Sequence, residues 1–281
     1  MLKIENLCKT YPSFRLKNVS FELPKGYIMG FIGANGAGKT TTLKSMLNIV
    51  KPDSGTVTIF GQDIVGNETA LKQRIGFMYG EADYYKHKRV GVVVDVYKRF
   101  FREWDDVAYR GYLDRFGLDE KKQISELSSG MKVKLALTLA LSHHADLFIF
   151  DEPTSGLDPV ARAELLDLFH EIVEDGEKSI LFSTHITSDL DKCADFIVFI
   201  RDGEIIANTT KDDLIAEHVL VSGKRSELSD GLQSRLVGVR QNAFGFTGLM
   251  RRERLMDGDP VVRETPNLED IMVYYDKGAS K

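Results

Sequence analysis

Cysteine is scarce in this sequence: Cys8 and Cys193 are the only two among 281 residues, and they form no CxxC pair. This scarcity argues against a disulfide framework and against a thiolate metal site. Long apolar runs are also missing, because runs such as residues 147–150 and 196–200 are far shorter than the roughly 20 residues of a membrane-spanning helix. Residues 1–14 lack the charged start and apolar stretch of a signal peptide. We therefore expect a soluble, intracellular chain that depends on another protein for any membrane crossing.

An excess of positive charge is missing as well. Lys and Arg total 37 against 42 Asp and Glu, which gives a net charge of −5. This balance argues against a protein held to nucleic acid by bulk positive charge, so we expect no nucleic-acid partner. The apolar fraction of 43% and the charged fraction of 28% are ordinary for a globular protein, and the length allows one or two domains.

Short β-branched runs alternate with helical patterns, which is typical of an α/β domain with a partly parallel sheet. Residues 2–23 predict short strands with a turn at residues 11–13. Further strands are expected at residues 26–32, 56–60, 75–79, 147–150, 179–182 and 196–200, and helical patterns at residues 38–49, 90–116 and 129–142. Beyond about residue 209 only short strand-like pieces (236–239 and 243–249), a cluster of arginines and a short helix (267–275) are expected.

Residues 33–40 match the pattern GxxxxGK[ST], and they stand between an expected strand and an expected helix. Glycines let the backbone curl so that successive N–H groups point at phosphate oxygens, and the following helix adds its positive N-terminus. A nucleoside triphosphate site is therefore predicted, with Lys39 on the β- and γ-phosphates and the Thr40 hydroxyl on Mg²⁺. The residues expected to hold ATP here are Gly33, Asn35, Gly36, Ala37, Gly38, Lys39, Thr40 and Thr41.

An apolar run at residues 147–150 ends in two carboxylates, Asp151 and Glu152. Such a pair alone is more often a helix cap or a solvated turn, but the phosphate loop upstream favours a catalytic interpretation. Asp151 is then expected to bind Mg²⁺ through water, and Glu152 to orient or deprotonate the attacking water.

Residues 127–131 read Leu-Ser-Ser-Gly-Met, directly before an expected helix. In this order with the other motifs, they resemble the LSGGQ signature of the nucleotide-binding subunits of ATP-binding cassette (ABC) transporters. In that family the signature serves the ATP held by the opposite protomer. The resemblance implies that Ser128, Ser129 and Gly130 contact nucleotide across a head-to-tail dimer, formed by two copies or with a second ABC ATPase subunit.

Three other residues match the family in order. Asp158 lies in a segment that resembles the D-loop, which crosses the dimer interface, and His185 matches the switch histidine that contacts the γ-phosphate. Tyr11 matches the aromatic residue that stacks on adenine. A lone histidine after a strand is usually structural, and a tyrosine before proline is also a normal turn residue.

The resemblance covers residues 1–215 and implies a P-loop NTPase of the ABC ATPase type. Its expected parts are N-terminal antiparallel strands, a central parallel-rich sheet and an inserted helical subdomain at about residues 85–142. Residues 216–281 are expected to form a small C-terminal α+β accessory segment.

The sequence departs from the family in two places. The family usually carries a Gln after the strand expected at residues 75–79, where this chain has Gly80 followed by Glu81. Glu81 is a candidate Mg²⁺ ligand, and a solvated acidic loop is the alternative. The signature has Ser129 in place of Gly, which keeps the small size and adds a hydroxyl donor, and Met131 in place of Gln, which removes a polar side chain.

The resemblance implies an ATPase subunit that acts with a separate integral membrane permease, peripheral on the inner face of the cell membrane. The tail at residues 267–275 and the missing Gln favour an exporter over an importer. A soluble ABC ATPase that acts in assembly or regulation is the alternative, whereas Glu152 and His185 argue against a non-hydrolysing regulator. The aromatic-rich segment from Tyr84 to Trp104 fits a subdomain core or, on another face, a permease contact centred on residues 84–89.

Overall fold

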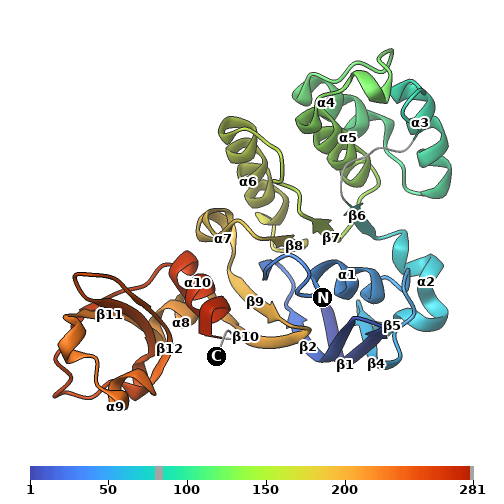
Figure 1. The fold of residues 1–281 in the computed structure, drawn as a ribbon. Helices are drawn as coiled ribbons and strands as arrows, with labels where there is room; N and C mark the ends of the chain where they lie inside the picture. The colour runs from blue at the N-terminus through green and yellow to red at the C-terminus, as the bar shows by residue number, and fades with distance from the viewer. Residues whose placement is uncertain (80–84, 279–281) are drawn as a thin grey trace.

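The computed structural model describes residues 1–79 and 85–278, and within them three β-sheets carry the fold (Figure 1). The first sheet is antiparallel, with strand order β2-β1-β4-β5, and comprises β1 (Leu2–Tyr11), β2 (Phe14–Leu23), β4 (Ser54–Ile59) and β5 (Gln62–Asp63). Strands β1 and β2 form a hairpin in which Tyr11 pairs with Phe14. The expected N-terminal strands and their turn are confirmed.

The central sheet has the order β10-β9-β3-β8-β7-β6. Its strands are β3 (Ile28–Ile32), β6 (Ile75–Tyr79), β7 (Leu147–Asp151), β8 (Ser179–Thr184), β9 (Phe196–Arg201) and β10 (Glu204–Thr210). Only the pairing of β10 with β9 is antiparallel. Every residue of β3, β7 and β8 is buried, so these strands lack the alternation of exposed and buried residues that marks a half-exposed strand. The carboxyl ends of the parallel strands meet at one edge.

The two faces of this sheet belong to different hydrophobic clusters. Along β7, Phe148 and Phe150 pack into the main cluster with helices α5 (Ser129–Leu141), α6 (Pro159–Val173) and α7 (Thr187–Cys193). Leu147 and Ile149 point to the other face and join the cluster of the first sheet and α1 (Lys39–Met46). The alternation follows from the period of two in a strand.

Helix α1 is shorter than the helical pattern at residues 38–49. It ends at Met46 because Asn48 takes a left-handed backbone conformation, with φ of 54°. The remaining helix of this region, α2 (Ile64–Lys72), precedes β6.

A separate helical region is inserted between β6 and β7, at the upper right of Figure 1. The helical pattern at residues 90–116 forms two helices, α3 (Val90–Tyr97) and α4 (Asp106–Phe116), because the backbone is extended at Phe101 and the Asp105 carboxylate caps α4. Helix α5 serves two cores: Leu135 and Leu139 face the cluster of this region, while other residues face the main cluster. This explains its burial on most sides.

The C-terminal segment forms a third, antiparallel sheet, which curls at the lower left of Figure 1. It contains β11 (His218–Gly223), β12 (Leu236–Gln241), β13 (Phe246–Arg251) and β14 (Val262–Glu264), together with α8 (Lys211–Ala216) and α9 (Asp230–Gln233). The last helix, α10 (Leu268–Gly278), packs on β12 and α7. In the described part of the chain, every helix is too short or too polar to cross a bilayer.

Candidate functional site

The phosphate loop connects β3 to α1, as the motif requires. Gly38 stands before the first turn of α1 with φ of 116°, and a Cβ there would lie 2.7 Å from Leu16 Cδ2 and 2.8 Å from Phe14 Cζ. Gly33 is equally constrained, because its Cβ would lie 2.4 Å from the Ile200 carbonyl oxygen. Only glycine fits at these two positions.

The loop fits a triphosphate. Within the described residues no side chain caps the N-terminus of α1, so backbone N–H groups of its first turn are free to meet an anion. The Lys39 side chain is only 6% exposed, and its ammonium donates to the Gly33 carbonyl at 2.6 Å and the Ala34 carbonyl at 3.3 Å. The loop therefore presents a buried positive charge beside a helix N-terminus.

The first turn of α1 and the end of β7 bring together two oxygen atoms of the kind that Mg²⁺ binds. Thr40 Oγ1 donates to Asp151 Oδ2 at 2.7 Å, and the Ser183 hydroxyl donates to Asp151 Oδ1. No group of three or more His, Cys, Asp or Glu side chains converges anywhere in the described residues. A pair of oxygen ligands fits Mg²⁺, which usually takes its other ligands from phosphate and water. The third predicted ligand, Glu81, lies outside the described residues.

Glu152 lies at the centre of the charged groups. Its Oε1 lies 3.3 Å from Lys39 Nζ, and its Oε2 lies 2.8 Å from His185 Nδ1. Its backbone is left-handed, with φ of 53°, and its N–H donates to Ser183 Oγ at 3.0 Å. The structure thus brings the predicted catalytic residues and the phosphate-loop lysine into direct contact.

An open cleft of about 670 Å³ lies over the phosphate loop. It is lined by Tyr11, Pro12, Ser13, Phe14, Ala34, Asn35, Gly36, Gly38, Lys39, Thr40, Thr41 and Glu152. Tyr11 is 38% exposed at the tip of the β1–β2 hairpin, as an adenine-stacking residue must be. Gly33 and Ala37 are buried beneath the loop rather than lining the cleft. Phe14 was missed, although its place beside Tyr11 in the hairpin could have indicated it.

The signature residues lie elsewhere. Ser128 caps α5 by accepting from the Met131 N–H at 3.2 Å, and both Ser128 and Ser129 are exposed. Asp158 caps α6 by accepting from two backbone N–H groups, and these hydrogen bonds hold the pKa of its carboxyl below its usual value. A Cβ on Gly156 would lie 3.8 Å from the Ser129 Cβ, so the signature adjoins the segment before Asp158. None of these residues lines the cleft of their own chain.

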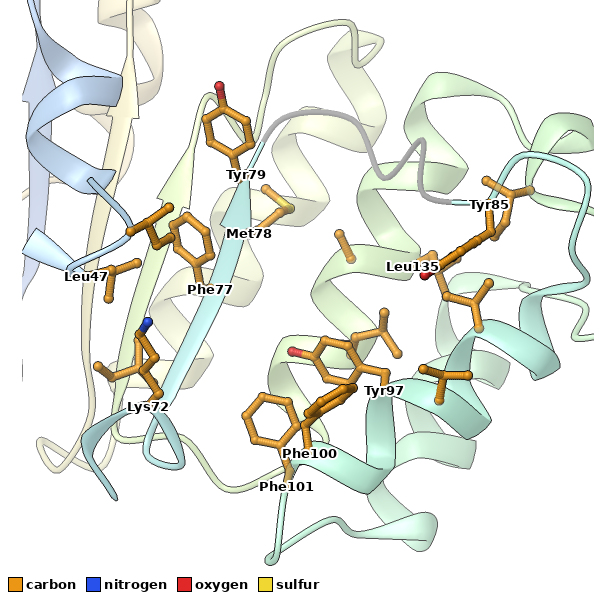
Figure 2. Close-up of a pocket in the computed structure, with 17 residues that line it drawn as sticks. Leu47, Lys72, Phe77, Met78, Tyr79, Tyr85, Tyr97, Phe100, Phe101 and Leu135 are labelled. Carbon is orange, nitrogen blue, oxygen red and sulfur yellow. The ribbon is translucent and has the colours of Figure 1, made fainter. Parts of the chain in front are cut away.

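A second cavity, of about 530 Å³, separates β6 from the helical region (Figure 2). We call it the aromatic groove; its lining includes Phe77, Tyr79, Tyr85, Tyr97, Phe100 and Phe101. Of the segment predicted to contact a partner, Tyr85 lines the groove, whereas Tyr84 lies outside the described residues. Trp104 instead packs against the core of the helical region, which confirms the subdomain-core interpretation for this part of the aromatic-rich segment.

The comparisons agree with this geometry. Residues 16–155 match the family described as ABC transporter. The Bacitracin transport ATP-binding protein BcrA of Bacillus licheniformis is 31% identical over 217 residues, covering 76% of this chain and 71% of BcrA. The Linearmycin resistance ATP-binding protein LnrL of Bacillus subtilis (strain 168) is 36% identical over 222 residues, covering 76% and 70%.

Solved structures share the fold. The structure of an ATP binding subunit of an ABC transporter superposes with a TM-score of 0.70 at 26% identity, over 77% of this chain and 92% of that one. The sequence similarity and the phosphate-loop architecture therefore indicate the same family. The chain belongs to the ABC transporter family as an ATP-binding protein, an ATPase with the α/β P-loop fold of that family.

Proposed function

We propose that this chain hydrolyses ATP to power export through a separate membrane permease. The observation that carries the hydrolytic part is the position of Glu152, whose carboxylate touches both Lys39 at 3.3 Å and His185 at 2.8 Å. A carboxylate at this place can accept a proton from a water molecule beside the γ-phosphate.

The residues act in a defined order when ATP enters the cleft. The Lys39 ammonium leaves the Gly33 carbonyl and Glu152 for the phosphate oxygens, since these carry more negative charge. Glu152 is then free to accept a proton from water while the water oxygen bonds to the γ-phosphorus. The bond from that phosphorus to the bridging oxygen breaks, which leaves ADP and phosphate. His185 stays within hydrogen-bonding distance of Glu152 and orients its carboxylate.

Thr40 and Asp151 would hold Mg²⁺ at the carboxyl end of β7, with Glu81 as a further proposed ligand. The ion supplies neutralisation of the phosphate charge that builds up during transfer. Before it arrives, the hydrogen bond from Thr40 to Asp151 keeps both oxygen atoms in place.

The signature supports a working dimer. Ser128, Ser129 and Gly130 are remote from their own cleft, and Asp158 is near them. A head-to-tail dimer, with a second copy or another ABC ATPase, places each signature over the opposite ATP. Loss of the γ-phosphate removes the charge that joins the two halves, and the dimer reopens.

The aromatic groove supports a permease contact. Figure 2 shows aromatic side chains from β6 on one side and from α3 and the following turn on the other, facing a common space. Phe100 is 68% exposed and Tyr85 67% exposed in the lining of this groove, so they present apolar surface that a partner could cover. The relatives BcrA and LnrL are named for bacitracin transport and linearmycin resistance, and both names support export. We place the chain on the cytoplasmic face of the membrane through this contact.

We also propose the division of the chain into an ABC ATPase domain at residues 1–215 and an accessory segment at residues 216–281. Separate hydrophobic clusters support it, because Val219, Val221, Phe246 and Met250 pack in a core of their own.

Two measurements test the function. Glu152→Gln should bind ATP as before and hydrolyse it at below about a hundredth of the native rate, because the amide cannot accept a proton. The matched control Glu164→Gln, on the surface of α6, should keep native turnover.

A tagged chain purified from its native cells in mild detergent should bring a multi-spanning membrane protein in equal amount. Recovery of soluble partners alone would instead favour an assembly or regulatory ATPase.

A further inference from the structure

Helices α6 and α7 each begin beside a residue of the proposed site. Asp158 precedes α6, and His185 lies two residues before α7. One helical turn further along, α6 carries Arg162 and α7 carries Asp189. Charges on these two helices can therefore connect the D-loop to the switch histidine.

The Asp189 carboxylate is in an unusual state. It is fully buried, at 0% exposure, and among the described residues no hydrogen-bond donor reaches either of its oxygen atoms. Its ion-pair partner is Arg162, whose Nε lies 3.9 Å from Asp189 Oδ1 and likewise has no hydrogen-bond partner there. A charge-assisted hydrogen bond between such groups is about 2.7–2.9 Å long. The two groups are therefore about 1 Å too far apart to form one, and we call this excess distance the gap.

The gap is costly for the protein groups on either side of it. A buried carboxylate without hydrogen bonds is destabilising, because nothing replaces the water it lost. Leu190 and Cys193 hold α7 in the main cluster, where Leu268 and Ile271 of α10 also pack. Since Leu190 and Cys193 anchor α7, a shift of about 1 Å by the Arg162 side chain or by α6 would bring the guanidinium within hydrogen-bonding distance of the carboxylate.

We propose that Arg162 and Asp189 are positioning residues that close to hydrogen-bonding distance in the ATP-bound dimer and so fix His185 relative to the D-loop. The proposal rests on the proposed function, in which His185 orients Glu152 for hydrolysis of the chain's own ATP and the signature and Asp158 belong to the dimer interface. The pair then transmits dimer closure to the Glu152–His185 contact, and its loss should slow hydrolysis more than it weakens ATP binding.

The experiment measures Mg-ATP hydrolysis and ATP binding by the full chain. Asp189→Asn should lower kcat at least tenfold and change KM less than twofold, since the amide leaves the guanidinium without a counter-charge. Asp189→Glu keeps the charge and reaches further across the gap, so it should stay within threefold of native kcat. The matched control Glu164→Gln breaks the 3.1 Å ion pair from α6 to Lys134 on α5 and should leave kcat within twofold.

A double-mutant cycle makes the result specific to the pair. The double variant Arg162→Met with Asp189→Asn should keep a kcat at least five times higher than the value predicted by multiplying the two single-variant losses. The proposal would be overturned if Asp189→Asn and Asp189→Glu lost kcat equally, or if the double variant lost as much kcat as the product of the two single losses. It would also be overturned if the loss of kcat were explained by unfolding of the variants at the assay temperature. If Asp189→Asn does not fold, Arg162→Met decides alone by the same tenfold criterion.

Native protein and Glu152→Gln are assayed alongside. If the native protein hydrolyses ATP and Glu152→Gln does not, the proposed function stands, and the Asp189 variants then test the role of the Arg162–Asp189 pair by itself. Absence of hydrolysis by the native chain would remove the function and this proposal together.

Discussion

Lys39 is the charge around which the phosphate loop is organised. In Lys39→Ala the loop keeps its glycines but loses the ammonium that now bonds to the Gly33 carbonyl and contacts Glu152. We expect ATP affinity to fall roughly tenfold to a hundredfold, because charge-assisted hydrogen bonds to phosphate are worth about 1.5–3 kcal/mol. Lys44→Ala is the matched control, since this lysine of α1 bonds to the Tyr79 hydroxyl at 2.9 Å rather than to the loop. Equilibrium binding measures both, and unchanged affinity in Lys39→Ala would count against the phosphate-loop assignment.

His143 is a buried histidine outside the ATP site. Its ring stacks on Phe101 with centroids 3.8 Å apart, and burial lowers its pKa from the usual 6.5 to about 4. The unfolded chain therefore binds a proton between pH 6.5 and 4 that the folded chain does not, and stability must fall as the pH drops through this window. The full effect is on the order of 3 kcal/mol.

His143→Phe should remove this part of the pH dependence, because the replacement ring has no proton to bind. Urea unfolding at pH 7 and pH 4.5 measures it, with His170→Phe, on the exposed face of α6, as the control. Equal loss of stability on acidification in native protein and His143→Phe would show that other groups dominate the acid limb.

The aromatic groove is a feature of whole elements, since β6, α3 and α5 must all be placed to form it. Phe100→Asp puts a charge where an apolar partner is expected and should reduce recovery of the permease at least tenfold, since an unpaired charge in an apolar interface is costly. Stability should change by less than about 1 kcal/mol, because the native side chain is exposed. Val107→Asp on α4 is the control, as that residue is 82% exposed and outside the groove. Undiminished recovery with Phe100→Asp would place the contact elsewhere.

The sequence predicts best the elements with strong local signals. Strands β3, β7 and β9 consist mostly of apolar residues and β8 contains the apolar run Ile180 to Phe182, and the phosphate loop has both its glycines and its flanking elements. Strand β10 was missed because its sequence, Glu-Ile-Ile-Ala-Asn-Thr-Thr, mixes polar residues at an exposed edge. Strand β11 was missed although Val219, Leu220 and Val221 form a short strand-like run, whereas β14 is three exposed residues that only pairing with β11 makes a strand. The contact between Glu152 and His185 depends on β7 and β8 being neighbours, which strand order alone decides.

Helix α7 links the ATP site to the C-terminal segment, because it follows His185 in sequence and packs against α10. Leu268, Ile271 and Tyr274 of α10 pack into the same cluster as Leu190 of α7. Arg201 donates to the Tyr275 carbonyl at 2.6 Å, and the Tyr275 hydroxyl lies 3.0 Å from His218 Nε2. The accessory segment is therefore packed against the helix that follows His185, and it supports the position of that helix beside the site.

Two incomplete copies should together make one complete site. In a dimer of Lys39→Ala with Gly130→Asp, one cleft has a native phosphate loop and faces a native signature, while the other has neither. Gly130→Asp is disruptive because a carboxylate beside Ser129 repels the γ-phosphate of the opposite ATP. If half of the dimers are mixed and each has one of two sites, turnover should recover to about a quarter of native. At ATP concentrations near the native KM each variant alone should hydrolyse ATP at only a small fraction of the native rate. A mixture that does no better would mean that two copies of this chain do not form the ATP sandwich, which would leave a second ABC ATPase subunit as the partner.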